Sequence, residues 1–169
     1  MVDIQKSAIA AQQVLDEHDI REPFVDVVTI AEKAGIEIRP VYFDTPHNDI
    51  SGFLTKEDDK PVIYVNAAED PRRQTFTIAH ELGHYFLNHS PNQWGIHLRN
   101  AHHFEEKEAS EQEADYFAAY LLMPERLLRK QMKKYNLTER DHTILAGMFA
   151  VSDDAMRRRL TYLDNIHAA

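Results

Sequence analysis

The sequence contains no cysteine among its 169 residues. This absence excludes disulfide bonds, thiolate metal sites and a cysteine nucleophile, so any bound metal must be held by histidine and carboxylate side chains. The opening stretch, MVDIQKSAIAAQQVL, lacks the basic segment and the apolar run of a signal peptide. No apolar stretch approaches the roughly 20 residues of a membrane span. We therefore expect a soluble cytoplasmic protein.

Positive charge is scarce over most of the chain. The formal net charge is −9, which argues against a general nucleic-acid binder. Residues 1–124 carry 10 Lys and Arg against 22 Asp and Glu, whereas residues 125–169 carry 9 against 6. The last quarter of the chain therefore has a different surface, and its simplest interpretation is a solvated basic helix face.

The order of the expected elements indicates an α+β fold. The apolar content of 43% is sufficient for an ordinary core. Strand patterns occupy residues 36–43, 50–55 and 61–66, which predicts a small, three-stranded and mostly antiparallel sheet. Helical patterns occupy residues 4–18, 25–35, 68–89, 105–123, 124–135, 138–150 and 152–163. A sheet followed by a helical half is typical of α+β proteins.

The most informative motif is HELGH, from His80 to His84, which fits the pattern H-E-x-x-H. On a helix, positions i and i+4 share one face, so both imidazoles can point at one ion. Zinc lowers the pKa of a bound water toward about 7 and polarises a scissile carbonyl. Glu81 lies beside the two histidines and can act as general base and then general acid.

The surroundings of this motif decide whether it is a site. A chain with 10 histidines and 14 glutamates would produce the pattern by composition alone about once in twenty. The alternative is therefore an amphipathic helix with solvated histidines. Apolar and small residues surround the motif, and they place the histidines on or beside a buried face, where unpaired imidazoles are costly. Binding of a metal would satisfy them.

A catalytic zinc usually has three protein ligands, so a third ligand is needed. The metzincin spacing requires Gly and His where this chain has Leu87 and Ser90, so that arrangement is excluded. His89 is five residues past His84 and does not easily reach round the same helix. We interpret it as a polar residue at the helix end.

A glutamate on the later helix is the other solution. Glu111 lies about 50° from the centre of that helix's apolar face, and Glu113 about 110°. Glu111 is therefore the preferred ligand and Glu113 the alternative, while an exposed acidic residue is the competing interpretation of Glu111. Asp115 lies one turn beyond Glu111 and can accept a hydrogen bond from the second nitrogen of a ligand histidine. Two histidines and one carboxylate suit zinc, and suit manganese or iron less well.

The residue that stabilises the oxyanion is not identified by its position. Candidates are Arg72, Tyr85, His97, His102, His103 and Tyr116, and each is equally an ordinary surface or packing residue. The strand PVIYVN, residues 61–66, leads directly into the motif helix. As an exposed sheet edge it could hold a substrate strand, and the alternative is a plain core strand.

Taken together, the segments SGFL, VIYVN, RRQTFTIAHELGHYFLNH and EQEADYFAAYLLMP resemble the ImmA/IrrE metallopeptidases of bacteria, phages and mobile elements, over about residues 20–124. The resemblance implies a zincin-like domain over residues 1–124, followed by a helical segment over residues 125–169. It also implies zinc held by His80, His84 and Glu111, with Glu81 as catalytic base. The family pattern Glu-x-x-x-Asp matches Glu111 and Asp115, although Glu113 lies in the same block.

The resemblance further implies a substrate, namely a helix-turn-helix transcriptional repressor that is often encoded nearby. Its limited cleavage would release phage, mobile-element or stress genes. One rival is a non-cleaving anti-repressor that keeps the zinc fold. A second rival is a DNA-binding regulator acting through residues 140–163, where two helices resemble a helix-turn-helix pair. Arg157, Arg158 and Arg159 of that pair could meet phosphates, although the acidic remainder of the chain would repel DNA.

Overall fold

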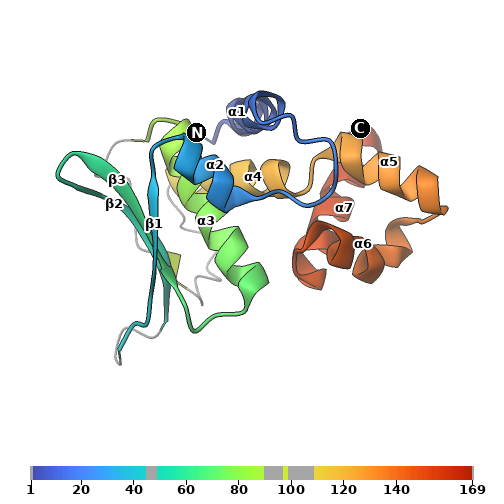
Figure 1. The fold of residues 1–169 in the computed structure, drawn as a ribbon. Coiled ribbons are helices and arrows are strands. Elements are labelled where there is room, and N and C mark those ends of the chain that lie inside the picture. Colours follow the sequence, from blue (N-terminus) through green and yellow to red (C-terminus); the bar gives the residue numbers. More distant parts are fainter. Residues whose placement is uncertain (1, 45–48, 90–96, 99–108, 169) are drawn as a thin grey trace.

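The computed structural model describes residues 2–44, 49–89, 97–98 and 109–168. As expected, it is an α+β fold, with a small sheet on one side and the described helices gathered on the other (Figure 1). The helices are α1 (Ile4–Glu17), α2 (Val27–Lys33), α3 (Pro71–Phe86), α4 (Ala109–Leu122), α5 (Glu125–Tyr135), α6 (His142–Phe149) and α7 (Asp153–Ala168), with a short 3₁₀ turn, η2 (Glu139–Asp141).

The sheet has the order β1-β3-β2-β4, with strands β1 (Glu37–Val41), β2 (Ile50–Glu57), β3 (Lys60–Asn66) and β4 (His97–Leu98). Strand β1 pairs with β3 in parallel, and the other two pairs are antiparallel. The prediction of three strands is confirmed by β1 to β3, but these three form a mixed sheet with one parallel and one antiparallel pair, and the prediction missed β4. That strand has only two residues, which is too short for an alternating pattern to predict it.

The prediction that residues 61–66 could form an exposed edge is wrong. Strand β3 lies in the sheet interior, hydrogen-bonded to β1 on one side and to β2 on the other. Val62, Ile63 and Val65 are each 1% exposed or less, as expected for a strand with neighbours on both edges. Pro61 is tolerated because it stands at the beginning of the strand.

A tight hairpin joins β2 to β3. Asp58 and Asp59 both adopt positive φ, at 48° and 63°, which is the backbone of a two-residue turn of the favoured I′ type. Aspartate tolerates this region better than most residues, because its short side chain can bond to nearby backbone. The hairpin aligns Gly52 with Val65, so the beginning of β2 lies beside the end of β3, close to where α3 begins.

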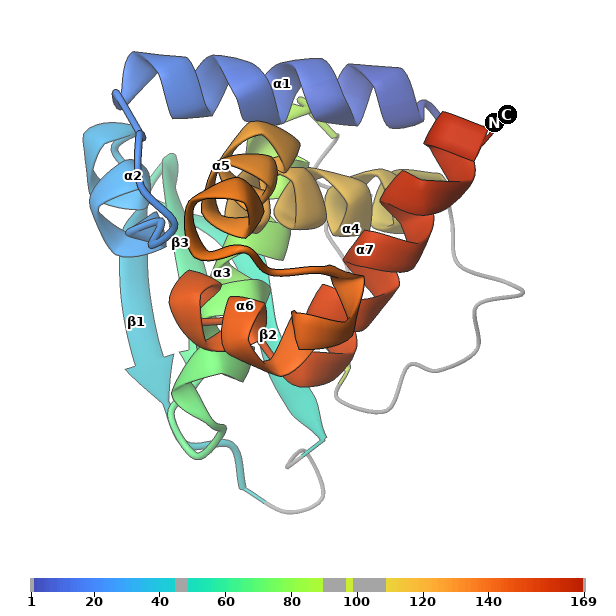
Figure 2. The same cartoon turned by 90° about the vertical axis from the view of Figure 1, so that its right-hand side faces the viewer.

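Helix α3 packs on the inner face of the sheet. Asp70 caps its first turn by accepting from the N–H of Arg72, and Pro71 occupies the first helical position. Gly52 permits the close approach, because a Cβ there would lie 2.6 Å from the side-chain methyl of Thr77 and 2.4 Å from the carbonyl oxygen of Tyr64. In the turned view, α1 runs across the molecule above α4 and α5 (Figure 2).

The last two helices join through a short turn, with Ala150 at φ 53° as the cap of α6. The first two arginines of the RRR run pair with acidic residues one turn earlier, Arg157 with Asp153 and Arg158 with Asp154, both at 2.9 Å. Arg159 is only 4% exposed and donates to the carbonyl of Met123. The expectation that Arg159 could meet phosphates is therefore wrong, since its guanidinium packs inside the fold, over the ring of Tyr120.

Among the described residues, no helix is both long enough and apolar enough to cross a bilayer.

Candidate metal centre

Helix α3 carries the three motif residues on its most buried turns. His80, Glu81 and His84 are each 0% exposed. Buried apolar residues of the same helix flank them, among them Ile78, Ala79 and Leu82. Burial of three ionisable side chains in one turn is costly unless they find partners, so the partners define what the site can do.

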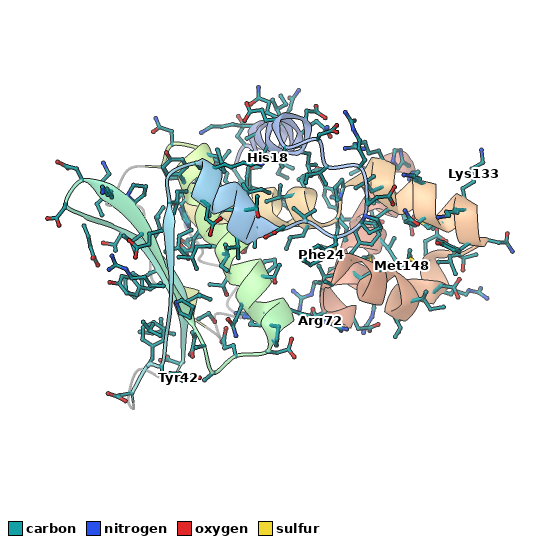
Figure 3. All side chains as sticks on the ribbon, in the orientation of Figure 1. His18, Phe24, Tyr42, Arg72, Lys133 and Met148 are labelled. Atoms are coloured by element: carbon teal, nitrogen blue, oxygen red, sulfur yellow. The ribbon has the colours of Figure 1, made fainter. Side chains whose placement is uncertain are left out.

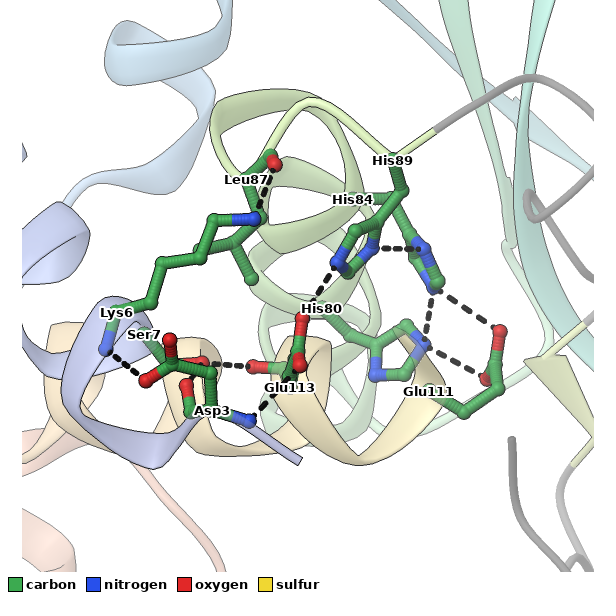
Figure 4. A network of polar contacts seen from close by, with 9 residues as sticks. All are labelled: Asp3, Lys6, Ser7, His80, His84, Leu87, His89, Glu111 and Glu113. Atoms are coloured by element: carbon green, nitrogen blue, oxygen red, sulfur yellow. Dashed lines mark hydrogen bonds and ion pairs between the residues drawn. The ribbon is translucent and has the colours of Figure 1, made fainter. Parts of the chain in front are cut away.

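Helix α4 brings Glu111 to the two histidines. Its Oε2 lies 3.3 Å from Nε2 of His80, and its Oε1 lies 3.1 Å from Nε2 of His84. The two Nε2 atoms are themselves 3.2 Å apart (Figure 4). One ligand atom from each of the three residues lies within 4.8 Å of the other two. Three donors therefore converge on one point.

Gly83 explains why the two helices come so close. A Cβ at this position would lie 3.0 Å from Cα of Ala114 and 3.1 Å from its carbonyl oxygen. A side chain at this position would press against α4, the helix that carries Glu111. The glycine inside HELGH is thus part of the geometry of the site.

Asp115 lies behind His80. Its Oδ1 is 2.9 Å from Nδ1 of His80, so the ring donates Nδ1–H to the carboxylate. This bond leaves Nε2 of His80 as the nitrogen that faces Glu111 and His84. The structure thus places Asp115 where a histidine ligand would need its second partner.

The charges of the cluster are strongly coupled. Burial alone would lower the pKa of His80, but hydrogen bonds to Asp115 and Glu111 outweigh it and raise the pKa to about 10. Burial lowers the pKa of His84, and its bond to Glu111 offsets this only in part. Burial would raise the pKa of Glu111, yet the bonds from both histidines bring it well below the usual range. The cluster therefore favours a positive charge at its centre.

Glu81 differs from these residues. Neither of its carboxylate oxygens makes a hydrogen bond of ordinary geometry with the described residues. Burial raises its pKa to about 7, although the charge of His80 and the nearby backbone of Leu54 lower it partly. A buried carboxyl group whose pKa lies near 7 has the properties of a general base.

The donor set fits a divalent cation. Two imidazole Nε2 atoms and one carboxylate are the ligands of many catalytic zinc sites, and such a set leaves room for a water. A bound cation would replace the proton that His80 otherwise holds, and it would satisfy the converging donors. These residues are also the ones that the spacing of the sequence selected.

Glu113, the alternative ligand, does not face this cluster. Its Oε2 lies 3.1 Å from Nε2 of His89, and its Oε1 accepts from the N–H of Asp3. His89 in turn lies 3.0 Å from Nδ1 of His84. The interpretation of His89 as a simple polar end of the helix missed this contact, although Asn88, a common residue at helix ends, could have signalled that the chain turns back there.

The residues considered for oxyanion stabilisation have different surroundings in the structure. Tyr85 donates its hydroxyl to the carbonyl of Ala34, and Tyr116 packs against the ring of Tyr162. Arg72 is exposed in the first turn of α3, two helical turns before the histidines (Figure 3). His97 belongs to β4, and the positions of His102 and His103 lie outside the described residues. No oxyanion role is assigned to any of them.

Three comparisons place the chain among known proteins. The family model described as Peptidase_M78, IrrE N-terminal-like domain, matches residues 31–161. The radiation response metalloprotease IrrE of Deinococcus radiodurans is 34% identical over 104 residues, which cover 59% of this chain and 30% of that protein. The chain thus matches less than a third of the length of this relative.

A solved structure shows a similar fold. A Mycobacterium tuberculosis transcriptional regulator aligns with 90% of this chain and 45% of its own, with a TM-score of 0.57 and 18% sequence identity. At this level of identity the likeness concerns the fold alone.

Proposed function

Because the chain belongs to the Peptidase_M78 family of IrrE N-terminal-like domains, we propose that it is a zinc metallopeptidase that makes a limited cut in a helix-turn-helix transcriptional repressor. The convergence of His80, His84 and Glu111 beside the buried Glu81 carries this proposal. Within it, residues 1–124 form a zincin-like peptidase domain and residues 125–169 a helical segment. We also propose a cytoplasmic location.

The roles of the residues follow from their contacts. His80, His84 and Glu111 would hold zinc. When bound, zinc would polarise the scissile carbonyl of the substrate and lower the pKa of a water toward about 7. Asp115 fixes the ring of His80. Glu81 accepts a proton from water and passes it to the leaving amine as the peptide bond breaks. The apolar bed around α3 keeps bulk water from competing for that proton.

The test is cleavage of the purified repressor encoded beside the gene. We expect zinc-loaded wild type to produce two fragments and Glu81→Gln to be slower by about 10²–10⁴-fold, which is the usual contribution of a general base. Both proteins should bind zinc equally, because Glu81 is not one of the three converging ligand residues. Mass spectrometry of the fragments locates the scissile bond.

A non-cleaving anti-repressor is the second candidate, and the family membership permits it. It predicts that wild type and Glu81→Gln remove the repressor from its operator equally well, without fragments. That result would refute the peptidase proposal. The presence of Glu81 favours cleavage, because a protein that only binds the repressor does not need a buried general base beside the metal ligands.

A further inference from the structure

A chain of polar contacts runs from the back of the His84 ring to helix α1 (Figure 4). Nδ1 of His84 lies 3.0 Å from Nδ1 of His89, and Nε2 of His89 lies 3.1 Å from Oε2 of Glu113. Oε1 of Glu113 accepts from the backbone N–H of Asp3 at 2.9 Å. His84, His89 and Glu113 are 0, 7 and 9% exposed, so water hardly competes for these contacts.

The end of α3 explains why His89 meets His84. Asn88 has a φ of 57°, its N–H donates to the carbonyl of Tyr85, and the N–H of His89 donates to the carbonyl of His84. This pair of bonds is the Schellman arrangement, which reverses the chain directly after the helix. The reversal folds residue 89 back over the last turn, so that the two rings lie with centroids 5.0 Å apart.

If Nε2 of His84 faces the metal cluster, the donors and acceptors in this series of contacts can be assigned in only one way. Nδ1 of His84 then carries the proton, so Nδ1 of His89 must accept. His89 consequently carries its proton on Nε2 and donates it to Glu113. The backbone N–H of Asp3 can only donate, so it completes the carboxylate from the other side. Each polar group in this series of contacts then has a hydrogen-bond partner.

We propose that His89 and Glu113 are positioning residues, which fix the tautomer and orientation of the His84 ring for metal binding. The inference rests on the proposed function, because it presupposes a metal at Nε2 of His84. It gives His84 the support that His80 receives from Asp115 directly. Here a second histidine is required, because it bridges the space between His84 and the carboxylate on α4.

Helix α1 belongs to this support, although it precedes the residues that the family model matches. Besides the amide of Asp3, the hydroxyl of Ser7 donates to the carbonyl of Glu113 at 3.0 Å. Lys6 donates its ammonium to the carbonyl of Leu87, the last residue before the chain reverses, at 2.9 Å. Helix α1 therefore holds both Glu113 and the segment that carries His89.

The experiment measures zinc affinity of the purified full chain by competition with a chromophoric chelator. We expect Glu113→Gln and His89→Phe to weaken zinc binding by about 10–100-fold, the usual effect of losing a partner behind a metal ligand. Glu69→Gln is the matched control, because Glu69 is equally 9% exposed and bonds to Ser51 instead. It should leave the affinity unchanged.

A further variant separates positioning from packing. His89→Asn keeps an acceptor at the place of Nδ1 but loses the donor to Glu113, so it should recover part of the affinity that His89→Phe loses. If the residue only filled space, the aromatic ring of phenylalanine would do no worse than asparagine. The cobalt absorption spectrum of each loaded variant provides a second readout, and thermal unfolding in a chelator shows that the metal-free variants are folded.

The outcomes distinguish this inference from the proposed function. If wild type binds zinc and the folded His89→Phe and Glu113→Gln variants bind it equally tightly, the positioning role is refuted while the peptidase proposal stands. If wild type itself fails to bind zinc, both are refuted. Weakened binding in both variants with recovery in His89→Asn supports the inference.

Discussion

At the scale of single residues, Glu111 connects the two histidines of the cluster and should determine whether the chain holds metal. We expect Glu111→Gln to remove the anionic ligand and leave less than about half an equivalent of zinc after purification, because two neutral imidazoles alone bind weakly. Elemental analysis of the purified protein measures this. Glu81→Gln serves as the control, since it should retain a full equivalent. A zinc-loaded Glu111→Gln protein would contradict the assignment.

At the same scale, His80, Glu81 and His84 were predictable because one helix fixes their mutual spacing. Glu111 was predictable only as the acidic residue nearer to an apolar face, and the structure places it against both histidines. Its role as a ligand stays a prediction. The link from His89 to Glu113 was not predictable, because it depends on a chain reversal after α3 and on a contact of Glu113 with Asp3, 110 positions away, and a local pattern reveals neither.

At the scale of elements, the contact of α3 with α4 depends on one glycine. Gly83→Ala should lower the free energy of unfolding by about 1–3 kcal/mol, because a Cβ there meets the backbone of Ala114. It should also weaken zinc binding by displacing Glu111. Gly147→Ala is the control, since nothing lies within 4 Å of its Cβ and alanine favours the helix by up to about 1 kcal/mol. Urea denaturation compares the two, and equal stability of both variants would show that the helices have room to spare.

The stability of the junction between α6 and α7 should depend on pH. Asp153 accepts hydrogen bonds from the hydroxyl of Thr143, from Arg157 and from His142. These bonds lower its pKa well below the ordinary 3.8. Because the folded pKa is the lower one, the stabilisation is fully present above the ordinary value and is lost as the pH falls toward the folded value. Wild type should therefore be more stable than Asp153→Asn at pH 7, and the difference should shrink below about pH 4.

Chemical denaturation of both proteins across this pH range measures the effect. Asp154→Asn is the matched control, because Asp154 lies in the same first turn and pairs with Arg158. A difference between wild type and Asp153→Asn that stays constant down to pH 3 would show that the carboxylate does not stabilise the junction through its charge.

The elements themselves followed from the sequence to different degrees. Alternating and helical patterns predicted β1 to β3 and the main helices, since each pattern reflects burial on one face. The order of the strands did not follow, because β1 pairs in parallel with β3 and not with β2, the strand that comes next in the sequence. The pairing joins residues that lie far apart in the sequence, such as Glu37 and Val62, so a local pattern does not reveal it.

At the scale of the whole molecule, charge argues against direct contact with DNA. In the basic segment 125–169, Arg157 and Arg158 are paired with aspartates and Arg159 is buried, and the remainder of the chain is strongly acidic. We expect Arg157→Glu combined with Arg158→Glu to leave binding to the repressor's operator DNA unchanged and undetectable at micromolar protein in a gel-shift assay. Binding by wild type that the double variant abolishes would instead support a DNA-binding regulator.

The bond from Asp3 to Glu113 also has a dynamic consequence. It joins residues 110 positions apart, so it forms only when α1 docks on α4 and it breaks whenever that helix detaches. An amide proton held by a shielded carboxylate exchanges slowly with deuterium while the helix is docked, and rapidly after it opens. The exchange rate of this one proton therefore reports, without any substrate, how often the support behind His84 comes apart.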